Sequence, residues 1–419
     1  MTFADESEGR AHGRPAASPD DGFALCGPGT PGGELLRRYW QPVAMSKNAT
    51  SRPRPVKLLG EDLILFRNGA GEVGLLYPRC MHRGTNLVYG KVEQTGIRCC
   101  YHGWLFDPQG HCLEMPSEAG EDAYRSVRQP WYPVVEKFGI IFAYLGPAVA
   151  QPAFPTFSIE EDLEPGEELV GYCNDTGANG PTPKIAGRTD YNWWQMFDNF
   201  IDPFHVVVLH NQINGVQFSA NLGLRPDVRF EYTADGVISI QRRKMADGTI
   251  HQRLSQIIMP NMNGTAGVTD EDLGRAHLGW TVPLDDRSFL QYGLARRADL
   301  IQSRKNFEGI GMMRDDWGPA HGRPFREWTF EDHQDWQTDY VAQKGQGDIS
   351  LHSEEHLVSA DQGIAMARRK FRQEAARVLK GEAPVGSTVE TPYRIEVLAG
   401  NALLDPNTGR CLAGFASRT

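Results

Sequence analysis

Short apolar segments separated by turn residues fill the first third of the chain, from Cys26 to about Leu145. Two of these segments, 56–59 and 63–66, flank Gly60, which is a good signal for a β-hairpin. The apolar run 140–145 is typical of a buried strand. The pattern therefore predicts a small all-β domain in this part of the chain.

The remainder of the chain contains a predicted domain junction, followed by segments with helical and strand periodicity. A stretch rich in Pro, Gly and acidic residues, 147–190, predicts a domain junction in its first part. Residues 192–210 are predicted as a helix, and residues 227–300 as strands with turns. A long amphipathic helix is expected over 354–379, because apolar residues recur there at helical spacing. The second domain should be a sheet with helices.

The fold class predicted from these patterns is α+β, with two folded domains. A length of 419 residues suggests two or three domains, and the periodicity favours two. We predict a disordered N-terminal tail at 1–22, because its composition is polar and poor in aromatic residues. The small β domain, with an N-terminal lead-in, is expected at 23–150, and the larger catalytic domain at 151–419.

Charge and cysteine content narrow the classes of function. The chain has 43 basic and 53 acidic residues, a net charge of -10, which disfavours nucleic acid and anionic membranes as partners. It has no apolar run of the ~18 residues needed to span a membrane and no secretory signal pattern, so we expect a cytoplasmic protein. Seven cysteines in that compartment indicate free or metal-binding thiols rather than disulfides.

Two pairs of thiol and imidazole lie in the β domain. Cys80 and His82 are followed, after sixteen residues, by Cys99 and His102. A zinc finger usually presents its cysteines first and its histidines later. One of each in both loops suits a two-iron cluster, with both thiolates on one iron and both imidazoles on the other. Structural zinc is the alternative, and the spacing alone also allows Cys100 in place of Cys99.

The two runs resemble a known motif. Residues 80–84 and 99–104 are similar to the Rieske [2Fe-2S] pattern, Cys-x-His and Cys-x-x-His-Gly-Trp. The resemblance implies that Cys99 is the ligand and that Cys100 is its neighbour. Met81 stands where the family often has Pro. The other cysteines are read as reduced structural thiols: Cys26, Cys100, Cys112, Cys173 and Cys411.

The predicted helix 192–210 carries a second set of candidate ligands. At about 100° per residue, Asp202 and His205 lie about 60° apart on one face. His210 points about 140° away from His205 on a regular helix. The helix must therefore be unwound or bulged if both histidines bind one metal, and Pro203 already weakens its hydrogen bonding. A helix with two ordinary, hydrogen-bonded histidines is the alternative.

This helix also resembles a family pattern. The spacing Asp198-Asn199-x-x-Asp202-x-x-His205-x4-His210 is similar to the mononuclear iron motif of Rieske oxygenase α-subunits, with Asp198 where Glu is usual. The resemblance implies that both histidines bind Fe(II) and that Asn199 and Asp202 are catalytic. Asp202 would bridge a Rieske histidine and an iron-binding histidine across a subunit boundary. We expect that bridge to join His102 and His205, although the sequence does not choose between His82 and His102.

The carboxylate ligand is expected far downstream. Residues 355–361, followed by basic residues at 368–370, resemble the family pattern Glu-His-Leu-x-x-x-Asp…Arg-Arg. The resemblance implies Asp361 as the third iron ligand, with Asp335 and Asp348 as fallbacks. Ser359 and Asp361 would equally suit a helix start.

The resemblance covers residues 26–380, and its opening, 26–42, is similar to the phthalate-dioxygenase-like branch, whose oxygenases are usually built from α-subunits alone. It implies a helix-grip, START-like catalytic domain, in which helices cover an antiparallel sheet, and a homo-oligomer such as a trimer or a hexamer of trimers. It implies a Rieske [2Fe-2S] cluster, mononuclear Fe(II) and O2 as co-substrate. A reductase, or a ferredoxin with its reductase, would supply electrons from NAD(P)H, because this chain has no dinucleotide fingerprint.

The function expected is therefore that of a terminal oxygenase that hydroxylates an aromatic substrate, with ring dioxygenation of an aromatic carboxylate as the first hypothesis. O-demethylation or side-chain hydroxylation of an aryl ether or aromatic acid is one alternative. An electron carrier without oxygenase activity is an alternative of another class, although the second iron motif counts against it. Arg243 and Arg253 are weak candidates for holding a substrate carboxylate.

Overall fold

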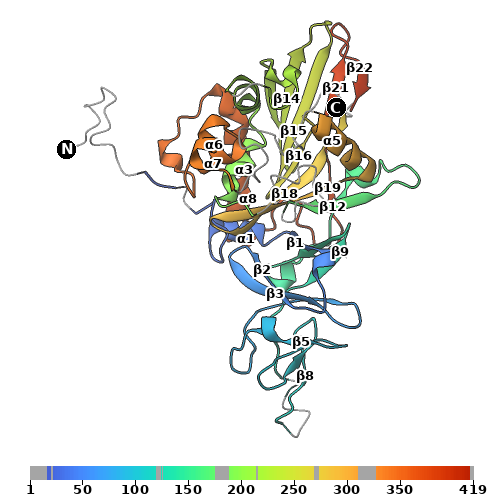
Figure 1. Cartoon of the computed structure of the whole chain (residues 1–419), viewed down its shortest axis with the longest axis vertical. Coiled ribbons are helices and arrows are strands. Elements are labelled where there is room, and N and C mark those ends of the chain that lie inside the picture. Colours follow the sequence, from blue (N-terminus) through green and yellow to red (C-terminus); the bar gives the residue numbers. More distant parts are fainter. Residues whose placement is uncertain are drawn as a thin grey trace, which may run out of the picture.

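A computed structural model of the chain describes residues 17–19, 22–118, 124, 126–174, 188–213, 216–268, 273–309 and 327–415. Small sheets form one end of the molecule, and a large sheet flanked by helices forms the other (Figure 1). The predicted α+β class is confirmed. The predicted tail at 1–22 lies almost wholly outside the described residues.

Three small antiparallel sheets account for the first third of the chain. The first has the order β1-β10-β9, the second β2-β3-β4 and the third β5-β6-β7-β8. The predicted hairpin joins β2 to β3, and its turn residues Leu59 and Gly60 both have positive φ, 49° and 81°, as a tight hairpin turn requires. The strands are β1 (Gln41–Met45), β2 (Arg54–Leu58), β3 (Glu61–Arg67), β4 (Val73–Leu76), β5 (Lys91–Val92), β6 (Ile97–Arg98), β7 (Leu105–Phe106), β8 (Cys112–Glu114), β9 (Val134–Lys137) and β10 (Ile140–Ala143).

A ten-stranded sheet dominates the second part. Its main path is β12-β19-β18-β16-β15-β14-β13, and β21 pairs with β15, β17 and β22. A separate parallel pair joins β11 to β20. The strands are β11 (Thr156–Phe157), β12 (Leu169–Cys173), β13 (Asp227–Tyr232), β14 (Gly236–Lys244), β15 (Ile250–Ile258), β16 (Met262–Thr265), β17 (Gly274–Arg275), β18 (His277–Asp285), β19 (Ser288–Arg296), β20 (Arg394–Ile395), β21 (Gly400–Leu404) and β22 (Cys411–Gly414).

Helices α3, α6, α7 and α8 gather on one side of this sheet, whereas α5 lies apart from them on the opposite side of the picture (Figure 1). The long helix α8 buries Ala367, Phe371 and Ala375, the spacing predicted for its apolar face, and Phe371 packs against the rings of Trp193 and Trp194. The α-helices are α1 (Pro31–Leu36), α3 (Trp193–Asn199), α4 (Phe204–Val208), α5 (Arg297–Gly309), α6 (Phe330–Asp335), α7 (Asp339–Lys344) and α8 (Gln362–Leu379). The shorter turns of helix are η2 (Ser46–Asn48), η3 (Leu87–Tyr89), η4 (Ala148–Ala150), η5 (Ser158–Glu160), the π-helix η7 (Leu209–Ile213), η8 (Ala220–Gly223), η10 (His352–Glu354) and η11 (Ser359–Asp361).

Two of the predicted helices are shorter than expected. The long helix begins at Gln362 rather than at residue 354, because η10 and η11 occupy the preceding residues. The helix predicted over 192–210 is divided between α3 and α4 at Pro203, and η7 follows α4 directly. Among the described residues no helix is long and apolar enough to cross a membrane.

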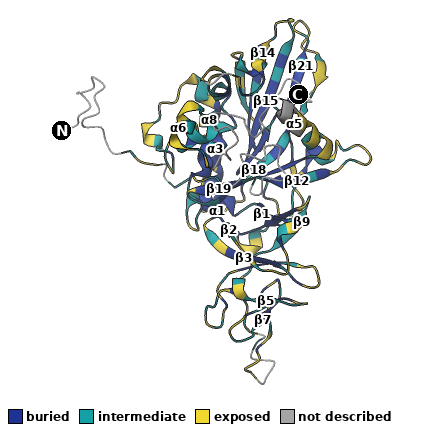
Figure 2. Cartoon of the chain, in the orientation of Figure 1, coloured by how far each residue is buried: buried dark blue, intermediate teal, exposed yellow. Residues whose placement is uncertain are grey.

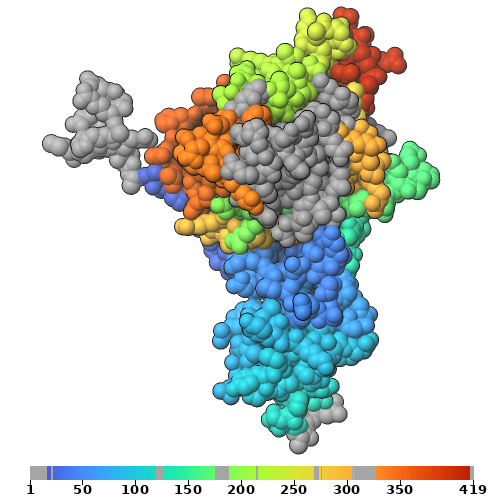
Figure 3. All heavy atoms as spheres, viewed as in Figure 1, coloured from blue at the N-terminus to red at the C-terminus, as the bar shows by residue number. Residues whose placement is uncertain are grey.

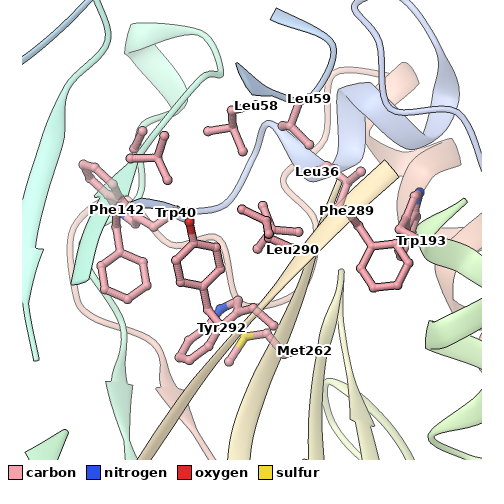
Figure 4. Close-up of a cluster of buried hydrophobic side chains, with 14 of the residues drawn as sticks. Leu36, Trp40, Leu58, Leu59, Phe142, Trp193, Met262, Phe289, Leu290 and Tyr292 are labelled. Atoms are coloured by element: carbon pink, nitrogen blue, oxygen red, sulfur yellow. The ribbon is translucent and has the colours of Figure 1, made fainter. Parts of the chain in front are cut away.

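One continuous hydrophobic core runs through both halves of the chain. Figure 4 shows Leu58, Trp40 and Phe142 from the first half beside Phe289 and Tyr292 from the second, all buried. The predicted boundary near residue 150 is therefore crossed by shared packing. A separate, smaller core lies under the cysteine–histidine loops and includes Cys80, Cys99 and Phe106. In Figure 2 buried residues are concentrated in the strands, and exposed residues lie mainly in loops and outer helices. The part of the chain around residues 80–115 forms the lower end of the molecule in Figure 3.

Candidate metal centres

The two cysteine–histidine loops are near-copies of each other. The amide of Gly84 donates to the carbonyl of Cys80 at 2.8 Å, and the amide of Gly103 donates to that of Cys99 at 3.1 Å. Both glycines have positive φ, 76° and 74°, and a Cβ at Gly84 would lie 2.7 Å from the Arg79 side chain. A larger residue would strain either turn. The glycine after each ligand pair therefore shapes the loop.

The four predicted ligands come together at this end of the chain. Cys80 and Cys99 are buried, and the rings of His82 and His102 lie 4.4 Å apart. Burial raises the pKa of Cys80 to about 11, against a hydrogen bond from the His82 amide, and the nearby Cys99 thiol adds to the rise. The buried Nδ1 of His82 has no hydrogen-bond partner, which suits an atom that binds a metal.

The arrangement fits a two-iron cluster better than a zinc ion. A tetrahedral zinc site would gather all four ligand atoms around one point. In the described part of the chain, the one set of three or more ligand-type side chains that converge within 4.8 Å lies elsewhere. Cys100 is exposed, whereas Cys99 is buried beside the other ligands. These residues therefore suit a [2Fe-2S] cluster, with Cys99 as the second thiolate.

That converging set is His205, His210 and Asp339, whose ligand atoms all lie within 4.8 Å of one another. His205 Nε2 is 3.7 Å from one carboxylate oxygen of Asp339, and His210 Nε2 is 3.2 Å from the other. Two imidazoles and one carboxylate are the donor set that holds Fe(II) with open positions. The residues present fit a mononuclear iron site.

The π-helix explains how the two histidines meet. On a regular α-helix, side chains five residues apart diverge by about 140°. A segment with i→i+5 bonding places them on the same side instead, and η7 begins just before His210. The irregularity expected if both histidines bind one metal is present, although the π-helix begins at Leu209 and lies mostly after His210.

Asp339, at the start of α7, takes the place that the sequence analysis gave to Asp361. The Asn199 amide donates to Asp339 Oδ1 at 3.1 Å. Burial would raise the pKa of Asp339, but His210, His205 and Asn199 hold it well below its usual value.

The assignment of Asp361 is therefore corrected. Its Oδ2 accepts the Val358 amide at 2.8 Å, so this carboxylate closes the turn that leads into α8. The fallback residues are also outside the group: Asp335 ends α6, and Asp348 pairs with Lys344 at 2.7 Å.

The downstream motif that suggested Asp361 has a structural explanation. Arg368 of α8 donates to Asp198 of α3 at 2.6 Å and to Glu355 at 2.5 Å. The two carboxylates and the guanidinium are largely buried, so the charges compensate one another. Asp198, which replaces the usual Glu, thus ties the ligand-bearing segment to α8.

Asp202 orients His205. Its Oδ1 accepts the amide of Phe204 at 2.8 Å, and its Oδ2 lies 3.5 Å from His205 Nδ1. Burial would raise the pKa of Asp202, yet His205 and the backbone amides hold it below its usual value. A quarter of the Asp202 side chain remains exposed, so it can accept another hydrogen bond.

A cavity of about 290 Å³ lies between α5 and the face of β12, β16, β18 and β19. Phe200, which follows Asn199 at the end of α3, belongs to its wall, whereas His205, His210 and Asp339 do not line it. Polar pairs in the wall include Tyr172 with His277 at 3.3 Å and Asn174 with Gln291 at 3.1 Å.

Neither arginine proposed for the substrate lies in that wall. Arg243 is buried beneath η8, where it donates to the carbonyl of Leu224 at 2.9 Å, and burial lowers its pKa to about 10. Arg253 donates at 2.5 Å to the carbonyl of Gly267, and Gly267 does line the cavity. Arg253 therefore supports the cavity wall from behind, whereas the hydrogen-bond partners of Arg243 do not line it.

Replacing Cys99 with Ser should abolish the cluster spectrum, because a buried thiolate ligand is lost. Replacing the exposed Cys100 with Ser should leave that spectrum unchanged. Visible absorption and iron content of the two purified variants check this. Loss of the spectrum in Cys100→Ser alone would reverse the assignment.

Asp339→Ala should lower iron from about three to about two atoms per chain while the cluster spectrum persists. The matched variant Asp361→Ala removes a capping carboxylate and should keep the full iron content, with a stability loss of about 1 kcal/mol. Metal analysis and thermal unfolding measure both. The ligand assignment fails if Asp361→Ala loses the iron and Asp339→Ala retains it.

Comparison with known proteins agrees with this geometry. Residues 39–134 match the family model described as the Rieske [2Fe-2S] domain. The phenoxybenzoate dioxygenase α-subunit of Ectopseudomonas oleovorans is 42% identical over 403 residues, covering 94% of each chain. The 5,5'-dehydrodivanillate O-demethylase oxygenase subunit of Sphingobium sp. (strain NBRC 103272 / SYK-6) is 32% identical over 397 residues, covering 88% of this chain and 82% of that protein.

The fold is similar to that of dicamba monooxygenase bound to 3,6-dichlorosalicylic acid, with a TM-score of 0.57 at 18% identity, covering 83% of this chain and 99% of that one. Both relatives named above are oxygenase subunits, which excludes the electron-carrier alternative. An iron–sulfur cluster and non-heme iron that works with O2 follow from the matched domain and these relatives. The chain therefore belongs to the α-subunits of the Rieske non-heme iron oxygenases.

Proposed function

We propose that this oxygenase hydroxylates an aromatic carboxylate by ring dioxygenation. The observation that carries the proposal is the 42% identity to a phenoxybenzoate dioxygenase α-subunit over 94% of both chains. The cavity of about 290 Å³ that has Phe200 in its wall is of a size for a small aromatic acid. When bound, the non-heme iron activates O2 with electrons delivered through the cluster.

In this proposal the protein holds the iron, orients its ligands and encloses the substrate. His205, His210 and Asp339 would hold the iron, and Asn199 keeps the carboxylate of Asp339 turned toward the histidines. Asn199 is thus a positioning residue in this proposal. The aromatic rings of Trp280 and Tyr292 supply apolar wall for a substrate ring.

A polar pair in the cavity wall suits the substrate carboxylate. Burial raises the pKa of Tyr172 well above its usual value, so its hydroxyl stays protonated and can donate to His277 Nδ1. With Tyr172 as the donor, the remaining N–H of His277 is of the kind that binds a carboxylate. Arg296 also lines the cavity but is already paired with Asp299 at 2.7 Å. Arg253, through the Gly267 carbonyl, would fix the position of the wall rather than touch the substrate.

Electrons would enter from a neighbouring subunit. The cluster-bearing end of the chain and the α3–α4 segment lie in different parts of the molecule, separated by the β1–β3 layer (Figure 1). We propose a homo-oligomer, a trimer or a hexamer of trimers, in which Asp202 accepts a hydrogen bond from His102 of the next subunit and joins it to His205. A reductase, alone or through a ferredoxin, would draw electrons from NAD(P)H in the cytoplasm.

Asp202→Asn should keep both metal centres populated but slow turnover about a hundredfold, because the carboxylate that orients His205 becomes a neutral amide. Reoxidation of the pre-reduced cluster by O2 and substrate, followed by stopped-flow absorption, measures the step. Asp335→Asn, an exposed acid on α6, is the control. Reoxidation at the normal rate in Asp202→Asn would contradict the bridge.

O-demethylation is the second candidate, favoured by the 32% identity to an aryl O-demethylase subunit. Aromatic acids, with and without methoxy or phenoxy groups, should be screened for substrate-coupled uptake of ¹⁸O2. Ring dioxygenation places both labelled atoms in the ring product, whereas demethylation leaves the phenol unlabelled and releases formaldehyde. We expect doubly labelled product from an aromatic carboxylate and none from its methyl ester. Turnover of neutral aromatics alone would refute the substrate class.

A further inference from the structure

The two histidines of the mononuclear site have different partners on their second nitrogens. His205 faces the Asp202 carboxylate, 3.5 Å from Nδ1. His210 faces a neutral amide: its Nδ1 lies 3.0 Å from Oε1 of Gln217. Gln217 is 4% exposed and belongs to none of the motifs found in the sequence. We propose that Gln217 is the positioning residue that fixes His210 for metal binding and couples it to the segment that delivers Asp339. This inference rests on the proposed iron site.

The orientation of the Gln217 amide follows from both of its contacts. Its Nε2 donates to the carbonyl of Gln337 at 3.1 Å. A flipped amide would set Oε1 against that carbonyl oxygen, two acceptors facing each other, so the orientation is fixed by the network. Oε1 therefore accepts from His210, which places the imidazole proton on Nδ1. His210 Nε2, which lies 3.2 Å from the Asp339 carboxylate, is then the imidazole atom that would bind the metal.

The Gln217 side chain is itself held in place. Its backbone amide donates to the carbonyl of His210 at 2.8 Å, so the chain folds back over the end of the π-helix. The ring of Phe218, the next residue, packs against the His210 imidazole at 4.2 Å between centroids. The His210 imidazole is thus hydrogen-bonded at its edge by Gln217 and packed against the ring of Phe218. Few rotations remain open to it.

The hydrogen bond from Gln217 to the Gln337 carbonyl links His210 to the segment that contains the third ligand, Asp339. Gln337 precedes Thr338, the N-cap of α7, and Asp339 is the first residue of that helix. One side chain therefore connects the histidine from the π-helix with the carboxylate from a segment more than a hundred residues later in the chain. Such outer contacts typically change metal affinity by about 10- to 100-fold. Loss of the Gln217 amide should free both ligands at once.

The test measures metal binding rather than turnover. Co(II) is titrated into oligomeric protein whose mononuclear iron has been removed by a chelator, with the cluster kept oxidised and EPR-silent. The high-spin Co(II) signal reports binding and coordination. Gln217→Leu, which removes both contacts, should weaken Co(II) binding about 10- to 100-fold and broaden the signal. Gln217→Glu keeps the acceptor for His210 but loses the donor to the Gln337 carbonyl, so it should restore only part of the affinity.

Gln195→Leu is the matched control. Gln195 is also a buried glutamine that donates to the α7 region, at 2.6 Å to the carbonyl of Gln343, but it touches neither histidine. It should bind Co(II) like the unaltered protein even if its unfolding temperature falls. Equal weakening in both Leu variants, or unchanged affinity in Gln217→Leu, would overturn the inference. Asp339→Ala distinguishes a failure of the Gln217 inference from a failure of the proposed iron site. If Asp339→Ala still binds Co(II) normally, the assignment of the iron site is wrong.

Discussion

Two histidines five residues apart on one helical segment must face a single carboxylate, and the chain meets this requirement by changing its helical geometry. The π-helix η7 begins just before His210 and turns that side chain to the same side as His205. Pro203 marks the break that lets α4 start as a separate short helix. The rest of the catalytic end supports this irregular segment from several directions.

Part of that support is polar. Arg368 of α8 holds Asp198 at one end of the segment, and Asn199 reaches Asp339. A bulged segment has fewer backbone hydrogen bonds in register, so side-chain contacts from neighbouring elements must define its position. The hydrophobic contacts of Phe371 with Trp193 and Trp194 fix where α8 lies, and the ion pairs then fix the register of α3 against it.

Features formed by residues that are close together in the chain could be predicted from the sequence. The cysteine and histidine pairs, the hairpin at Gly60 and the irregularity between His205 and His210 all follow from residues close together in the chain. Asp339 could not be found in this way. It begins a short helix that is brought to the histidines by tertiary packing, and nothing beside it in the sequence distinguishes it from other helix-starting acids. Asp361 was preferred because of its neighbours Glu355 and Arg368, which bind Asp198 instead.

Tertiary packing also modifies the division into two domains that the sequence predicts. The apolar pattern separates a small β part from a larger mixed part, yet their buried side chains form one core that crosses residue 150. Within the part of the chain that the structure describes, only the loops that carry Cys80 and Cys99 have a core of their own. The cluster-bearing end is thus a distinct extremity on a shared body, a shape that suits presentation of the cluster to another molecule.

The central claim is that His205, His210 and Asp339 hold one iron. Anomalous diffraction from crystals of the iron-loaded protein, collected on both sides of the iron absorption edge, locates each iron directly. The account predicts density for two irons at the Cys80–Cys99 loops and a single peak bounded by His205 Nε2, His210 Nε2 and the Asp339 carboxylate. An iron peak beside Asp361, or a peak that touches only one of the two histidines, would contradict it.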